Sequence, residues 1–174
     1  MRNWRAFVAD LGSRGFRERE SLNPGTRYAR RRANLDETVD VVSTEELHAL
    51  TGDRDGVFVQ ALKTHEVMIY DGHSFYGSLN VLQNRENYPA DTYQVVFMNS
   101  CWSYEYYTKQ VFAAKSTPDD PSGWLLADVV NNTESAWFAN MADETRILLT
   151  NLFAGAESGG RSGNKVTALT VDPR

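Results

Sequence analysis

Two continuous apolar segments, residues 66–70 and 93–98, constrain the fold of this chain more than any other feature of its sequence. Each is rich in β-branched or aromatic residues and stops at turn-forming residues, which is typical of a strand. A strand that is apolar along its whole length is buried on both faces, as in a parallel sheet covered by helices. Residues 79–87 lie between the two segments and have about the length of a crossover helix.

The remaining periodicity extends this pattern to an open, mostly parallel α/β sheet with helices on both faces and right-handed crossovers. Helical spacing of apolar residues and N-cap signals predict the helices, and β-branched or apolar runs predict the strands. The expected helices are residues 4–11, 44–50, 57–63, 79–87, 103–115 and 140–153. The expected further strands are residues 39–42 and 124–130, with 166–171 as an added edge strand.

The length of 174 residues fits one principal domain, and 41% hydrophobic residues are enough for an ordinary core. We expect residues 1–38 to form an N-terminal helix and an Arg-rich connector of low order. Residues 39–174 are expected to form the α/β domain. Within it, residues 155–163 are rich in Gly and Ser and are expected to be flexible.

The net charge of −5 is unevenly distributed, with about +3 in residues 1–40 and about −8 in the rest. The acidic main body argues against nucleic acid as the principal partner, and the short Arg-rich run is typical of a solvated surface. No apolar run approaches the roughly 18 residues that span a bilayer. The first residues lack the apolar core of a secretion signal. We therefore expect a cytoplasmic protein with no membrane partner.

The two apolar strands each end next to a residue that can perform chemistry. His73 follows the first strand, and Cys101, the single cysteine, follows the second. Functional groups of parallel sheets collect beyond the carboxyl ends of the strands, so neighbouring strands would bring these two side chains together. A thiol beside an imidazole can act as a nucleophile with an acid/base partner. The alternative is that Cys101 is a small buried apolar residue and His73 a turn residue.

Competing motifs are weaker. The segment around Ser74 resembles a G-x-S-x-G nucleophile elbow but is one residue too long, and all three histidines precede the serine. Asp53 and Asp55 before Gly56 form half of a calcium loop without its later ligands, so a plain turn is favoured. The chain contains no nucleotide-binding glycine motif. No cofactor and no metal are expected.

The two strand ends resemble those of a known family. Residues 67–74, ending in Gly72-His73-Ser74, and residues 95–101, ending in Ser100-Cys101, are similar to the caspase, gingipain and clostripain superfamily of cysteine peptidases. The resemblance extends loosely over residues 39–153 and implies a caspase-hemoglobinase fold. It also implies that Cys101 is the nucleophile and His73 the catalytic histidine.

The resemblance further assigns an oxyanion hole to the backbone N–H groups of Ser74 and Cys101. Family members commonly have Gly at the position of Ser74. In peptidases of this fold, the loop after the strand that follows the cysteine helps to line the substrate pocket. The pocket residues implied here are Asp128, Asn131, Asn132, Glu134 and Trp137. Their carboxylates could favour a basic side chain by charge pairing, and solvation of a surface loop explains the same acids equally well.

The expected function is therefore a cysteine endopeptidase that cleaves polypeptides through a thioester acyl-enzyme, with a preference for basic residues. The alternative is a catalytically inactive module of the same fold that binds a protein partner or a second copy. An enzyme of this kind could cut itself after Arg30, Arg31 or Arg32 in the connector. A solvated, uncut basic patch is the other interpretation of these arginines.

Overall fold

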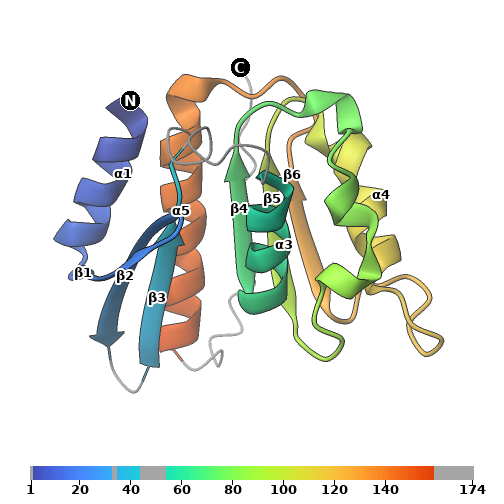
Figure 1. Cartoon of the computed structure of the whole chain (residues 1–174), viewed down its shortest axis with the longest axis horizontal. Coiled ribbons are helices and arrows are strands. Elements are labelled where there is room, and N and C mark those ends of the chain that lie inside the picture. Colours follow the sequence, from blue (N-terminus) through green and yellow to red (C-terminus); the bar gives the residue numbers. More distant parts are fainter. Residues whose placement is uncertain (1, 33–34, 44–53, 159–174) are drawn as a thin grey trace. The chain divides into compact units, whose positions relative to one another are not determined.

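The computed structural model describes residues 2–32, 35–43 and 54–158 (Figure 1). The chain divides into two compact units, Met1–Ser43 with Ala142–Arg174 and Thr44–Met141. The elements are, in order, α1 (Arg2–Ser13), β1 (Arg17–Leu22), β2 (Gly25–Arg32), β3 (Leu35–Val41), α3 (Arg54–Thr64), β4 (Val67–Asp71), η1 (Phe75–Gly77), η2 (Asn80–Gln83), η3 (Arg85–Asn87), β5 (Gln94–Asn99), α4 (Ser103–Lys115), β6 (Ala127–Asn131) and α5 (Phe138–Glu157).

The second unit is built on a parallel sheet in the order β4-β5-β6. The two apolar segments form β4 and β5, and the central strand β5 is buried along its whole length. Asp71 lies opposite Asn99, and Met98 lies opposite Asn131. An α/β fold with a parallel sheet is therefore confirmed, and the strands end in register at one carboxyl edge.

Helices α3 and α4 share one hydrophobic core with this sheet. The buried side chains of that core are Phe58, Leu62, Met68, Leu79, Leu82, Tyr88, Val96, Met98, Tyr107, Val111 and Ala114. Removing each large apolar side chain from water contributes about 1.5–3 kcal/mol. The stripe of Tyr107 and Val111 explains why residues 103–115 form the expected helix.

The crossover between β4 and β5 differs from the prediction. Residues 79–87 were expected to form a helix, and the structure has the short 3₁₀ turns η2 and η3 there. Two asparagines compete with the helical hydrogen bonds: Asn84 Oδ1 accepts the N–H of Glu86, and Asn87 Nδ2 donates to the carbonyl oxygen of Val81.

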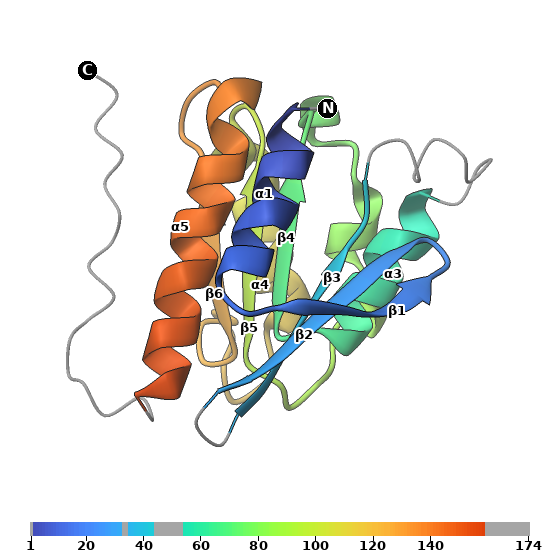
Figure 2. The same ribbon diagram turned by 90° about the vertical axis from the view of Figure 1, so that its left-hand side faces the viewer.

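The first unit contains an antiparallel sheet in the order β1-β2-β3, seen in blue in Figure 2. The expectation of a low-order connector is therefore wrong, and the predicted strand 39–42 belongs to this sheet instead of the parallel one. Opposite charges stabilise the pairing across β2 and β3. Arg27, Arg30 and Arg31 each lie directly opposite an acidic residue of β3.

Arg30 is the most enclosed of these arginines. Its side chain is 7% exposed and forms ion pairs with Glu37 and with Glu157 of α5. Its guanidinium carbon lies 4.5 Å from the ring centroid of Phe16 and 5.3 Å from that of Phe153. Self-cleavage after Arg30, Arg31 or Arg32 was predicted because the connector was expected to be of low order. These arginines lie in strand β2 instead, so that reason for self-cleavage does not hold.

Several expectations fall partly or wholly outside the described residues. The helix 44–50 and the strand 166–171 cannot be compared with the structure. Of the predicted flexible segment 155–163, residues 155–157 form the last turn of α5, and residues 159–163 lie outside the described part. Among the helices that the structure describes, none has the length and apolar character needed to cross a membrane.

Candidate active site

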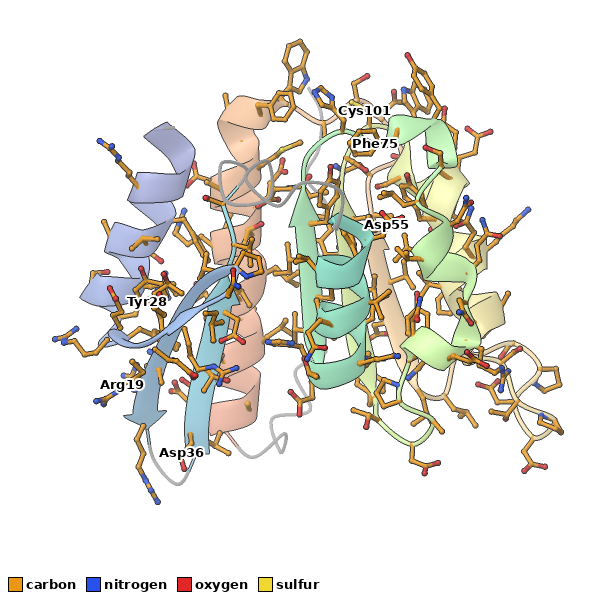
Figure 3. All side chains as sticks on the ribbon, viewed as in Figure 1. Arg19, Tyr28, Asp36, Asp55, Phe75 and Cys101 are labelled. Atoms are coloured by element: carbon orange, nitrogen blue, oxygen red, sulfur yellow. The ribbon has the colours of Figure 1, made fainter. Side chains whose placement is uncertain are left out.

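His73 and Cys101 lie at the same carboxyl edge of the parallel sheet. Asp71 at the end of β4 pairs with Asn99 at the end of β5, and each of the two candidates follows two residues later. They therefore occupy equivalent positions in neighbouring loops. His73 is exposed and Cys101 is half-buried. Figure 3 shows Cys101 and Phe75, a residue of the loop that carries His73, at the same end of the parallel sheet.

A chain of hydrogen bonds joins the three strand ends beneath these loops. Asn99 is fully buried, and its Nδ2 donates to Asp71 Oδ1 at 3.0 Å. Asn132, after β6, donates from Nδ2 to Asn99 Oδ1 at 2.8 Å. The N–H of Gly72 donates to the backbone oxygen of Asn99 at 3.2 Å. Asn99 thereby fixes the His73 loop and the loop after β6 relative to the start of the Cys101 loop.

Cys101 lies between the end of β5 and the start of α4. Its Sγ is 3.8 Å from the carbonyl oxygen of Ala136. The loop after β6 also accepts hydrogen bonds from backbone N–H groups at the start of α4. The N–H of Trp102 donates to the backbone oxygen of Glu134, and the N–H of Tyr104 donates to that of Asn132, both at 3.0 Å. These bonds satisfy donors that a helix N-terminus leaves open, so the segment around Cys101 is fixed.

Aromatic rings surround His73. The Phe138 ring is nearly perpendicular to the imidazole, with centroids 5.0 Å apart, and the Phe75 ring centroid is 6.4 Å away. Within the described residues, the imidazole of His73 makes no hydrogen bond. Its ring nitrogens are therefore open to exchange a proton with a bound molecule.

Strained backbone is concentrated at this edge. Phe75, Tyr76 and Trp102 have φ angles of 47°, 50° and 56°. In the part of the chain that the structure describes, these are the non-glycine residues with left-handed backbone, and all three are exposed aromatics. Bulky residues rarely adopt this conformation, and such strain often accompanies function.

The two predicted oxyanion donors are open. Within the described ranges, the backbone N–H groups of Ser74 and Cys101 donate no hydrogen bond. The Ser74 peptide is held from its other side, because its carbonyl oxygen accepts the Tyr107 hydroxyl and the N–H of Gly77.

The predicted pocket is only partly assembled. Asp128 lies near the amino end of β6, opposite Val95, where it accepts the Tyr93 hydroxyl. The prediction is therefore wrong for Asp128, because it lies toward the other end of the strand. Burial and this carboxylate raise the pKa of Tyr93 to about 12.

The other four predicted pocket residues lie at the carboxyl edge with different roles. Asn131 is a tether, because its Nδ2 donates to the Ser103 oxygen at 3.2 Å and to Thr108 Oγ1 at 3.0 Å. Asn132 belongs to the hydrogen-bond chain through Asn99. Glu134 and Trp137 have exposed side chains and are free to contact a ligand.

Sequence reasoning missed three contributors to this edge. Asp71 and Asn99 are among the turn-forming residues at which the two apolar strands are predicted to stop, and short polar residues at both strand ends were a usable signal. Phe138 gave no signal, because its contact with His73 depends on where α5 begins.

No three His, Cys, Asp or Glu side chains of the described residues gather as ligands for a metal ion. Comparisons with protein-family models, with curated proteins and with solved structures find no match for this chain.

Proposed function

We propose that this chain is a cysteine endopeptidase of caspase-like type, with Cys101 as the nucleophile and His73 as the acid/base. The observation that supports this best is the in-register placement of the two residues at one sheet edge, braced through Asn99. The resemblance of both strand ends to the caspase superfamily supports the same assignment.

The reaction follows from the two side chains. His73 takes the thiol proton of Cys101, and the sulfur attacks the carbonyl carbon of the scissile peptide. The C–N bond then breaks as His73 returns the proton to the leaving amine, which leaves a thioester on Cys101. Water, deprotonated by His73, hydrolyses the thioester and restores the thiol. The reaction needs no cofactor.

The negative charge of each tetrahedral intermediate would rest on the substrate oxygen. The open N–H groups of Ser74 and Cys101 are the donors that we assign to this oxygen. Cys101 also precedes α4, and the N-terminus of a helix favours nearby negative charge.

The substrate is proposed to be a polypeptide in the cytoplasm. With Asp128 removed from the pocket, a preference for basic side chains rests on Glu134, whose carboxylate is exposed on the loop after β6. Charge pairing with Lys or Arg is the physical basis of that preference.

A second candidate is an inactive module that binds a protein partner or another copy. Two observations favour it: the Cys101 thiol points at the Ala136 oxygen, and the described parallel sheet has three strands where peptidases of this fold usually have about six. Measurement of the mass in solution, alone and with a binding partner, distinguishes it when peptidase activity is absent.

Hydrolysis of a mixed peptide library tests the assignment. We expect Cys101→Ala to abolish cleavage and His73→Ala to slow it by roughly 10²–10⁴-fold, the usual contribution of acid/base catalysis. His65→Ala is the matched control, because His65 lies at the amino end of the sheet beside Thr64. Cleavage that survives Cys101→Ala would contradict the proposal.

A further inference from the structure

A groove of about 620 Å³ runs along the outer face of α4. Tyr104 and Phe112 line it from the helix, and Pro121 and Trp124 line it from the loop that follows α4. Its volume falls in the range of ligand sites, which are mostly apolar with a few polar groups. Lys109 supplies a charge to its lining and forms no ion pair among the described residues.

The loop that carries Trp124 is held rigidly. Asp120 is its centre: Oδ2 accepts the N–H of Leu125 at 2.9 Å, and Oδ1 accepts the hydroxyl of Ser122 at 2.5 Å. These hydrogen bonds lower the pKa of Asp120. Gly123 has a φ of +73° and lies so close to the backbone of Phe112 that a Cβ there would be 2.1 Å from its oxygen. The loop is therefore fixed against the end of α4, and Trp124 stays 69% exposed.

The groove extends along α4 as far as the first turn of the helix. Tyr104, Thr108 and Phe112 are spaced four residues apart, so they form one stripe along the helix. The stripe begins at Tyr104, which lies in the first turn of α4, three residues after Cys101, and is 57% exposed. At 1.5 Å per helical residue it is about 12 Å long, which corresponds to about four residues of extended chain.

We propose that this groove binds the part of the substrate polypeptide that lies beyond the scissile bond. Its occupant is an extended segment with two large apolar side chains about four residues apart and a carboxylate between them. The apolar side chains pack at Tyr104 and against Trp124 and Phe112, and the carboxylate pairs with Lys109. The inference rests on the proposed function for the identity of the chain as substrate.

Binding of a short probe tests the groove independently of catalysis. The probe is a fluorescein-labelled Phe-Ser-Glu-Ser-Leu peptide, and its affinity for the Cys101→Ala protein is measured by fluorescence polarisation. We expect Trp124→Ser to weaken binding about tenfold, because the variant loses the aromatic packing contact with the peptide. Lys109→Met should weaken this probe severalfold but leave a Phe-Ser-Gln-Ser-Leu probe unchanged.

Leu125→Ser is the matched control, because Leu125 is the neighbour of Trp124, is 70% exposed and does not line the groove. The Leu125→Ser variant should bind the probe with the same affinity as the Cys101→Ala protein in which it is made. Equal affinity of the Trp124→Ser protein, or of a probe with Ser at both apolar positions, would overturn the proposal.

A kinetic measurement then separates the groove from the catalytic assignment. In the wild type, a cleaved library peptide extended by the probe segment should have a lower KM than the same peptide extended by serines, with kcat unchanged. Trp124→Ser should remove that difference. An unchanged KM would overturn the role in substrate binding. If the probe binds specifically but no peptide is cleaved, the groove binds peptides as proposed and the assignment of peptidase activity is wrong.

Discussion

Asn99 holds Asp71 across the ends of two neighbouring parallel strands, with 3.0 Å between Asn99 Nδ2 and Asp71 Oδ1. Asn99 Oδ1 also accepts a hydrogen bond from Asn132 Nδ2 at 2.8 Å, and Asn99 has no exposed surface. The loops that carry His73 and Cys101 both begin at this pair. Their relative position therefore depends on a buried side chain that need not touch the substrate.

Asn99→Leu should reduce both stability and catalysis. The substitution removes the two hydrogen bonds that the buried Asn99 side chain makes with Asp71 and Asn132, and each typically contributes about 0.5–1.5 kcal/mol. Urea denaturation measures the loss. In peptide hydrolysis, we expect kcat to fall more than KM rises, because the loop geometry is disturbed. Asn151→Ala, on the exposed side of α5, is the control. Unchanged stability and kcat would show that Asn99 does not position the loops.

Arg30→Met should destabilise the first unit by about 3–5 kcal/mol, because it leaves the buried carboxylate of Glu37 without its ion-pair partner. Arg31→Met is the neighbouring control on β2: its pair with Asp36 is exposed, at 3.6 Å, and is expected to contribute less than about 1 kcal/mol. Thermal or urea unfolding of both variants checks the prediction. Equal effects would mean that burial of Arg30 does not determine its contribution.

Tyr93 should make the protein sensitive to alkali. Its pKa is about 12 in the folded state against an ordinary value of 10.0, chiefly through burial and then through Asp128. Between these values the folded state binds more protons than the unfolded state, so the free energy of unfolding falls as pH rises. Tyr93→Phe should lose less stability than the wild type between pH 10 and pH 12. Parallel curves for the two proteins would refute the assignment.

Tyr76→Gly should stabilise the fold. Tyr76 has left-handed backbone and is 91% exposed, so glycine relieves strain at little loss of packing. The expected gain is about 1 kcal/mol in unfolding free energy. Tyr76→Ala keeps the Cβ that causes the strain and should give no comparable gain. If alanine and glycine are equally stabilising, the backbone of Tyr76 is not strained.

The parallel sheet could be predicted from sequence because its signals are local. The apolar segments of β4 and β5 and the Tyr107–Val111 stripe of α4 are visible within a few residues of chain. The antiparallel sheet could not, because its charged strands are stabilised by pairs such as Arg27 with Asp40, thirteen residues apart. Pairing of this kind produces no periodic pattern of apolar residues in the sequence.

The same division applies to the candidate site. The positions of His73 and Cys101 at one edge follow from the strand order, so the sequence indicated them. The contact of His73 with Phe138 depends on the loop after β6, which local patterns do not describe. Asp128 was misplaced because β6 begins at Ala127, which puts this carboxylate near the amino end of the sheet.

Covalent labelling of Cys101 by a peptidyl acyloxymethyl ketone, followed by intact mass spectrometry, examines the Cys101–His73 pair itself. Such a reagent needs both a thiolate and a bound peptide, so the account predicts one label per chain in the wild type. It also predicts at least tenfold slower labelling in His73→Ala and none in Cys101→Ala. Labelling of His73→Ala at the wild-type rate, or of the native wild type no faster than of the urea-unfolded chain, would contradict the proposed dyad.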